Sequence, residues 1–503
     1  MRIVLGSLIA LFLSLVLFIG GNVLLGTLIS LRLDLEGVNE NLLGLVLAFY
    51  SLGFIVGATF CVRIIREVGH IRAFAAFAAV ACAATLFHPI WITPESWAVM
   101  RFLVGFSIAG LLTVTESWIN DRATNESRGK ILGFYTIILY VASALGQLLV
   151  GVGNPMSYAM FSLVAILLVL SLVPLALTRS LIPTVPTPTE FLGTKRLLLQ
   201  APAGVTGVLV SGIALGGFVS LGPIYALRIG LEVGMLSMYM GVSVACAIVL
   251  QWPAGWLSDR VGRIPVLVAL LLLGALAAAG TATFSSQSVL LMFALSGTFY
   301  ALSSSMYPVG IALANDQLPN DQLVAASAAL LRIYGVGTML GPLLGAYFMG
   351  VFDEAALFYF IAITLLVAGL AVQFVFRKGD EVALEDQGEF AVVSPVSTPV
   401  IVELDPRNEE YEDHSTGEAA EWDVADKMEM LVIDADALIE EQSNDEDEEA
   451  TAEEETPTVA QGAMEESVDE TPAPLSKEVA VEFDEEGVPI VKLYRDEDDD
   501  AEG

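Results

Sequence analysis

The sequence predicts an all-α membrane protein in which twelve transmembrane helices form two parallel six-helix pseudo-repeats, followed by a disordered acidic C-terminal tail. Apolar runs of about twenty residues, enough to cross the ~30 Å hydrocarbon core of a bilayer, recur from Met1 to Lys378. Beyond Lys378 no such run occurs, and 43 of the 58 acidic residues lie there. A polar motif that follows the fourth run is repeated after the tenth.

The first apolar run begins beside a single basic residue, as a signal peptide does, but it continues to Leu31 without a small-residue cleavage site. It is therefore expected to be a membrane helix. The spans are expected at residues 4–31, 41–62, 73–90, 97–118, 131–152, 158–178, 200–224, 235–257, 265–284, 289–313, 325–349 and 355–376. The predicted domains are an N-terminal six-helix bundle (1–178), a cytoplasmic inter-bundle loop (179–199), a C-terminal six-helix bundle (200–378) and the tail (379–503).

The basic residues of the loops predict the orientation. Fourteen Lys and Arg residues fall on the face that holds both termini, whereas the opposite face has only Arg32 and Arg228. Because cytoplasmic loops carry the excess of Lys and Arg, both termini are expected in the cytoplasm. The predicted location is the bacterial inner membrane.

The two halves share a polar motif. Asn120-Asp121 is followed after three residues by Asn125-Glu126, and Asn315-Asp316 is followed at the same spacing by Asn320-Asp321. The offset between the two copies is 195 residues. Two halves in the same orientation are typical of transporters built from parallel repeats, which bind their substrate near the midplane between the repeats.

Polar residues within the spans predict an internal cavity. The third, sixth, ninth and twelfth spans are almost purely apolar, as expected of helices that face lipid, while the other spans carry polar side chains. The residues expected to line a transport path or to bind substrate are Asn22, Tyr50, Arg101, Glu116, Gln147, Gln251, Tyr300 and Arg332.

The ionisable members of this set each allow two interpretations, because a charge at membrane depth is costly and usually functional. Arg332, predicted near the midplane, either binds an anionic group of the substrate or pairs with helix carbonyls and polar neighbours. Arg101, about a turn inside the outer face, either extends to water or serves the substrate or a gate. Glu116 lies near the cytoplasmic face; it is either a protonation site or, as favoured here, a partner of the loop residues Arg66, Arg72 or Arg122.

A gate motif is expected between spans eight and nine, where the chain reads Gly255-Trp256-Leu257-Ser258-Asp259-Arg260-Val261-Gly262-Arg263. A tight glycine turn with one acid and two guanidinium groups can clamp neighbouring helix ends. Its defined positions are Gly255, Asp259, Arg260, Gly262 and Arg263. The alternative is simple positive-inside anchoring.

This motif resembles the loop signature of the Major Facilitator Superfamily, G-x-L-x-D-R-x-G-R, at every defined position. The first copy expected by that resemblance, at residues 67–72, keeps a glycine and basic residues but lacks the Asp. Arg101 and Gly105 resemble the R-x-x-x-G of the superfamily's fourth span, and Thr115–Asp121 looks like the end of that span in the YcaD-like branch of bacterial permeases. The resemblance implies alternating access by rocking of two halves.

The predicted function is secondary active or facilitative transport of a small solute. No nucleotide-binding loop, zinc spacing or catalytic triad is present in the sequence, so neither an enzyme nor a cofactor, metal or nucleic-acid partner is expected. The alternative is a transporter-like sensor or scaffold whose acidic tail recruits a basic cytoplasmic protein. Two tail stretches, Met428 to Ile439 and Val488 to Tyr494, are the ones expected to order on such a partner.

Overall fold

A computed structural model gives the fold of the chain. It describes residues 2–123, 127–177, 193–285, 287–319, 322–376, 396–404, 479–483 and 489–493, together with the single positions 382, 387, 390 and 394. Twelve of the described helical segments are long and apolar enough to cross a membrane. The predicted fold class, an all-α membrane protein with twelve spans, is thereby confirmed.

The N-terminal half supplies six spans. Its helices are α1 (Arg2–Leu35), α2 (Glu40–Val68), α3 (His70–Phe87), α4 (Pro94–Arg122), α5 (Arg128–Leu149, continued by η1, Val150–Val152), α6 (Tyr158–Leu170) and α7 (Leu172–Ala176). The short helices α6 and α7 together form the sixth span. The start of α4 is well specified, because Thr93 caps the helix by accepting from the Ser96 N–H and Pro94 occupies the first turn.

The C-terminal half follows the same plan. Its helices are α8 (Thr194–Gln200), α9 (Pro202–Arg228), α10 (Val233–Val261), α11 (Arg263–Phe284), α12 (Val289–Asn315), α13 (Leu323–Val351) and α14 (Ala356–Ala371, continued by the π-helical η3, Val372–Phe376). The tight turns between α2 and α3 and between α10 and α11 each depend on a glycine with positive φ. Gly69 has φ +84° and Gly262 has φ +98°, a conformation that L side chains rarely adopt.

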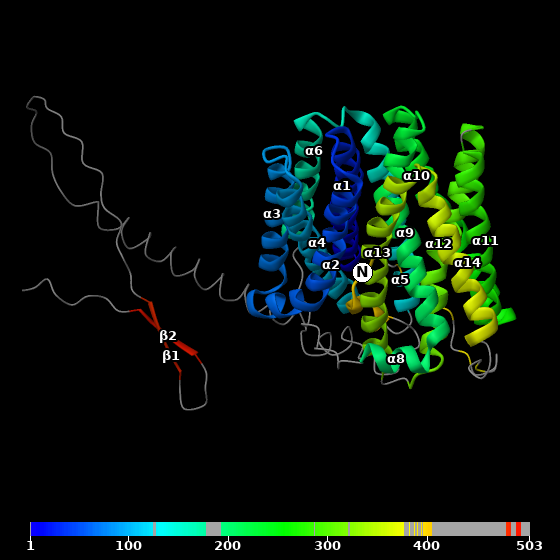
Figure 1. Cartoon of the computed structure of the whole chain (residues 1–503). Helices are drawn as coiled ribbons and strands as arrows, with labels where there is room; N and C mark the ends of the chain where they lie inside the picture. Colours follow the sequence, from blue (N-terminus) through cyan, green and yellow to red (C-terminus); the bar gives the residue numbers. More distant parts are fainter. Residues whose placement is uncertain are drawn as a thin grey trace, which may run out of the picture. The chain divides into compact units, whose positions relative to one another are not determined.

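For reference below, the end of the bundle that holds these two turns is called the predicted cytoplasmic end, and the opposite end is the predicted outer end. Figure 1 shows α3 and α11 at opposite edges of the bundle. Large apolar side chains on these edge helices are exposed, for example Val80 on α3 and Leu276 on α11. Side chains of this kind are suited to contact lipid tails rather than water.

Glycines allow the two halves to approach closely at the predicted outer end. A Cβ added to Gly44 of α2 would lie 2.7 Å from the Pro342 carbonyl oxygen of α13, and one on Gly151 would lie 2.5 Å from the Ser237 hydroxyl. Small residues at such positions let membrane helices pack backbone to backbone. The two halves are therefore in direct contact at the predicted outer end.

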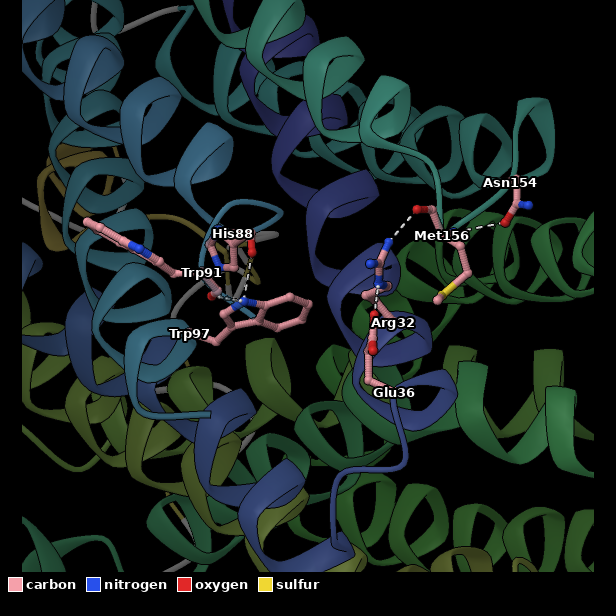
Figure 2. A network of polar contacts seen from close by, with 7 residues as sticks. All are labelled: Arg32, Glu36, His88, Trp91, Trp97, Asn154 and Met156. Carbon is pink, nitrogen blue, oxygen red and sulfur yellow. Dashed lines mark hydrogen bonds and ion pairs between the residues drawn. The ribbon is translucent and has the colours of Figure 1, made fainter. Parts of the chain in front are cut away.

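Several side chains near this end are held by hydrogen bonds (Figure 2). Arg32 pairs with Glu36 at 2.7 Å and also donates to the Met156 carbonyl oxygen. The Trp97 indole N–H donates to the carbonyl oxygens of His88 and Trp91, both at 2.8 Å. Burial of His88, beyond the end of α3, lowers the pKa of its imidazole to about 3, so the ring is neutral.

The beginning of the predicted tail departs from the expectation of disorder. Residues 396–404, which include the 3₁₀ helix η5 (Pro399–Leu404), pack against α4, α5 and α13, and Ile401 and Leu404 are fully buried. The reason is compositional, since residues 390–402 contain no charged residue although acids surround them. Apolar groups of this kind gain free energy on burial.

The chain beyond Asp423 forms a separate unit. In it, β1 (Val479–Phe483) and β2 (Pro489–Leu493) pair antiparallel, with Val481 opposite Val491. β2 falls within Val488 to Tyr494, the second tail stretch that was expected to order on a partner. The first stretch, Met428 to Ile439, lies outside the described residues.

Candidate functional site

A cavity lies between the two halves of the bundle. Its walls come from α1, α2, α4 and α5 on one side and from α9, α10, α12 and α13 on the other. The empty space amounts to about 1220 Å³, part of it open to solvent.

Five of the eight residues predicted for the transport path line this cavity: Asn22, Tyr50, Arg101, Gln147 and Tyr300. They come from α1, α2, α4, α5 and α12, so the cavity collects side chains from both sequence halves. The other three, Glu116, Gln251 and Arg332, lie elsewhere.

Arg101 is the charged residue of the cavity wall. Its side chain does not extend to the helix end; the residue is 5% exposed, and its guanidinium carbon lies 4.5 Å from the centre of the Tyr50 ring. The Tyr50 hydroxyl accepts a hydrogen bond of 2.9 Å from the Asn22 amide. Among the described residues, neither Nε nor Nη1 of Arg101 has a hydrogen-bond partner.

No carboxylate offsets this charge within the cavity, because none of the described residues that line it is Asp or Glu. A buried guanidinium normally pairs with an acid, since an isolated charge in a medium of low dielectric is costly. The face of Tyr50 offers partial compensation through a cation–π contact. The cavity thus presents a positive group whose hydrogen-bonding capacity is largely unused by the protein.

Aromatic rings make up much of the remaining wall. Tyr140 of α5, Phe54 of α2, and Tyr300 and Tyr334 of the C-terminal half surround the space. Gln251 of α10 stands behind this wall, where its amide donates to the Tyr140 hydroxyl at 3.3 Å. Gln147 is fixed in a similar way, because its side-chain oxygen accepts from the Thr27 hydroxyl at 2.8 Å.

Arg332 is half-buried on α13 and does not face the cavity, although its neighbours Leu331, Tyr334 and Gly335 do. Leu331, Tyr334 and Thr338 lie three or four residues apart and define the cavity side of α13, and Arg332 is not among the residues that line the cavity. Of the two predicted arginines, Arg101 is the one in the cavity.

Glu116 lies toward the predicted cytoplasmic end of α4 and is fully buried. Two donors to its carboxylate come from α5 and from the beginning of the predicted tail. The Tyr135 hydroxyl donates to Oε1 at 2.6 Å, and the Thr398 backbone N–H donates to both carboxylate oxygens at 2.9 and 3.0 Å. The contact with Thr398 was not expected, because nothing in the sequence indicates that the tail returns to this helix.

The gate motif makes a specific set of contacts within the C-terminal half. Arg263 is fully buried and forms an ion pair of 2.5 Å with Asp316 at the end of α12, while its distance to Asp259 is 3.9 Å. Arg260 lies over the Trp256 ring, 4.1 Å from its centre. The motif therefore joins α11 to the second copy of the Asn-Asp motif that the sequence revealed.

Some cavity residues were missed by sequence reasoning. Tyr140 and Tyr334 carried a usable signal, since each is a hydroxyl-bearing residue within a predicted span. Val396 carried none, because it belongs to the predicted tail and yet lines the same cavity as Arg101.

Twelve spans in two halves, with a cavity between them that combines an apolar wall with a few polar side chains, define a membrane transporter. The chain belongs to the Major Facilitator Superfamily, whose family model matches residues 10–301 and 207–407. It is 32% identical over 342 residues to the MFS-type transporter YcaD of Escherichia fergusonii and to that of Shigella flexneri. Each match covers 67% of this chain and 87% of the relative, and places the chain in the YcaD-like branch.

Solved structures share the fold. The nucleoside transporter NupG superposes with a TM-score of 0.60 at 14% identity, covering 75% of this chain and 100% of that one. A bacterial homologue of the human lysosomal transporter Spinster, in an inward-facing and unoccupied conformation, has a TM-score of 0.60 at 15% identity, covering 76% and 98%. At these identities the likeness concerns the fold.

Proposed function

We propose that this transporter moves a small organic solute with an anionic group across the bacterial inner membrane by alternating access, with both termini in the cytoplasm. The observation that carries the substrate class is Arg101, a buried cation in a cavity wall that has no Asp or Glu among the residues the structure describes. An anionic ligand would supply the missing hydrogen-bond acceptors in charge-assisted form.

The aromatic wall supports an organic rather than a simple inorganic anion. Rings of Tyr50, Phe54 and Tyr300 offer apolar faces to the body of a solute, while the two tyrosine hydroxyls and the amides of Asn22 and Gln147 offer polar contacts. Pockets of this mixed character orient a ligand through a few polar groups and bind it mainly by apolar contact.

The direct contact between the halves at the predicted outer end supports an inward-facing state of the rocking cycle. Arg228 of α9 reaches Asp34 and Glu40 of the N-terminal half at 2.7 and 3.2 Å, and glycine contacts surround this ion-pair cluster. Secondary transporters with parallel repeats alternate by rocking one half against the other around a fixed site. The scaffold alternative would depend on the acidic tail beyond residue 404, which lies largely outside the described residues.

The test is ligand-induced stabilisation of the purified protein. A panel of organic anions and their neutral analogues is screened by the shift in Tm, which rises with ligand concentration for a specific ligand. The Arg101→Gln variant is expected to lose the shift that an anion gives, whereas Arg332→Gln, which removes the same charge from outside the cavity, keeps it. Loss of the shift in Arg332→Gln alone, or stabilisation by neutral analogues only, would refute the assignment.

A further inference from the structure

The cavity has a lining residue that does not belong to any membrane span. Val396 comes from residues 396–404, named here the plug segment, which follow the last span in the chain. The plug segment contacts α4 and α5 of the N-terminal half and α13 of the C-terminal half. It therefore lies between the two halves at the predicted cytoplasmic end.

Several hydrogen bonds hold the plug segment on the bundle, as they would hold a ligand. Thr398 donates its backbone N–H to both oxygens of Glu116, and its hydroxyl donates to Oε2. One turn further along α4, the Asn120 amide donates to the Val400 carbonyl oxygen at 2.6 Å. Both Glu116 and Thr398 are buried, with exposed fractions of 0% and 1%.

Apolar contacts complete the docking. Ile401 and Leu404 of the plug segment are fully buried and belong to the hydrophobic core of the bundle. Nearby in the chain, the ring of Phe390 lies against Gly255 of the gate motif so closely that any added Cβ would clash with it. A glycine at this motif position thus admits an aromatic ring from the tail.

We propose that the plug segment is an intramolecular ligand of a peptide-binding site formed by α4, α5 and α13, and that it obstructs the cytoplasmic exit of the cavity until it is released. Because the two halves are already in direct contact at the predicted outer end, docking of the plug segment restricts the second exit. Rocking to an outward-facing state brings the cytoplasmic ends of the halves together, so the plug segment must leave first. The docked state is consequently autoinhibited.

The carboxylate of Glu116 makes docking specific. A buried carboxylate needs several donors, and the plug segment supplies two of them, the backbone N–H and the hydroxyl of Thr398, while Tyr135 supplies another. Release leaves Glu116 with its Tyr135 bond and with access to water from the opened side. The energetic penalty of an unsatisfied buried carboxylate is thereby avoided in both states.

Obstruction of the cytoplasmic exit by the plug segment does not depend on the proposed function, whereas inhibition of transport does. The experiment tests these two claims separately. The reporter is Ser143→Cys, at a half-buried position on the cavity wall, in a full-length chain whose Cys61, Cys82 and Cys246 are replaced by alanine. The rate of its reaction with a bulky charged maleimide is measured in inside-out vesicles.

Two variants remove docking, and one serves as the matched control. Deletion of residues 396–404 and the point change Thr398→Pro, which lacks the backbone N–H, are each expected to raise the labelling rate about tenfold or more, because access to a closed site follows its open population. Deletion of residues 446–454, equal in length and within the acidic tail, is expected to leave the rate unchanged.

Equal labelling rates in all four proteins would overturn the proposal, as would a rise in the control deletion alone. If labelling rises as expected, solute-dependent stabilisation is measured on the same variants. Faster labelling without any solute that stabilises the protein would support the plug segment and contradict the proposed transport of an organic anion.

Discussion

Arg228 donates from Nε and Nη2 to one carboxylate oxygen of Asp34, at 3.0 and 2.7 Å, and so joins the end of α9 to the end of α1. These helices belong to different halves, and Glu40 at the start of α2 adds a second acid at 3.2 Å. The pair is partly exposed, with side-chain exposures of 25% for Arg228 and 12% for Asp34. The ion pair therefore matters because it connects the two halves, and it must break before the predicted outer end can open.

Weakening this pair is expected to populate the outward-open state. In the Asp34→Asn variant, a cysteine at the cavity residue Ser220 should react faster with a membrane-impermeant maleimide applied from outside, because one inter-half ion pair of up to about 1 kcal/mol is removed. Glu36→Gln is the control, since Glu36 pairs with Arg32 within one half. Equal acceleration in both variants would show that the position of the charge does not matter.

Gly44 is predicted to tolerate no side chain. Gly44→Ala places a Cβ 2.7 Å from both Pro342 O and Ala346 Cβ, so the halves must separate at the predicted outer end, at a cost of roughly 1–3 kcal/mol. The same change at Gly133, where nothing lies within 4 Å, should be neutral or slightly stabilising. Thermal unfolding in detergent compares the two. A larger loss of Tm at Gly133 would contradict the packing argument.

The buried ion pair of the gate motif is expected to be a major contributor to the stability of the C-terminal half. Asp316→Asn leaves Arg263 buried without its 2.5 Å carboxylate and should cost about 3–5 kcal/mol in the free energy of unfolding. Arg260→Gln, at the exposed side of the same motif, should cost less than about 1 kcal/mol. Similar Tm losses in the two variants would favour simple charge anchoring over a clamp.

The free energy of unfolding should decrease as the pH falls below 6.5, because His88 is buried. Its folded-state pKa is lowered to about 3, so between pH 6.5 and that value the unfolded chain binds a proton that the folded chain does not. The folded state therefore loses up to about 1.4 kcal/mol per pH unit as pH falls below 6.5. His88→Asn should flatten the decline in Tm between pH 6.5 and 5, above the range where most carboxylates titrate. An unchanged slope would mean that His88 does not set it.

The sequence was sufficient for features that depend on composition and spacing. Apolar run length predicted the twelve spans, and polar residues within spans predicted five cavity residues, including Arg101 and Tyr300. Both signals are local, since membrane burial and helical spacing act on each segment separately.

The sequence was insufficient where distant segments decide the outcome. Glu116 and Thr398 are 282 residues apart, and nothing near either residue indicates the other. Counting along the sequence placed Arg332 within its span, but the face of α13 that meets the cavity is set by packing against other helices. Rotation of a helix about its axis is a tertiary property.

The two glycine turns at the predicted cytoplasmic end have one more implication. Gly69 and Gly262 have similar backbone conformations, yet the next residue is His70 in the first turn and Arg263 in the second. His70 is buried, and neither ring nitrogen has a hydrogen-bond partner among the described residues, whereas Arg263 is held to Asp316. The two halves thus share the glycine turn, but in the C-terminal half the residue after it is tied by an ion pair to the end of α12, whereas His70 makes no such tie among the described residues.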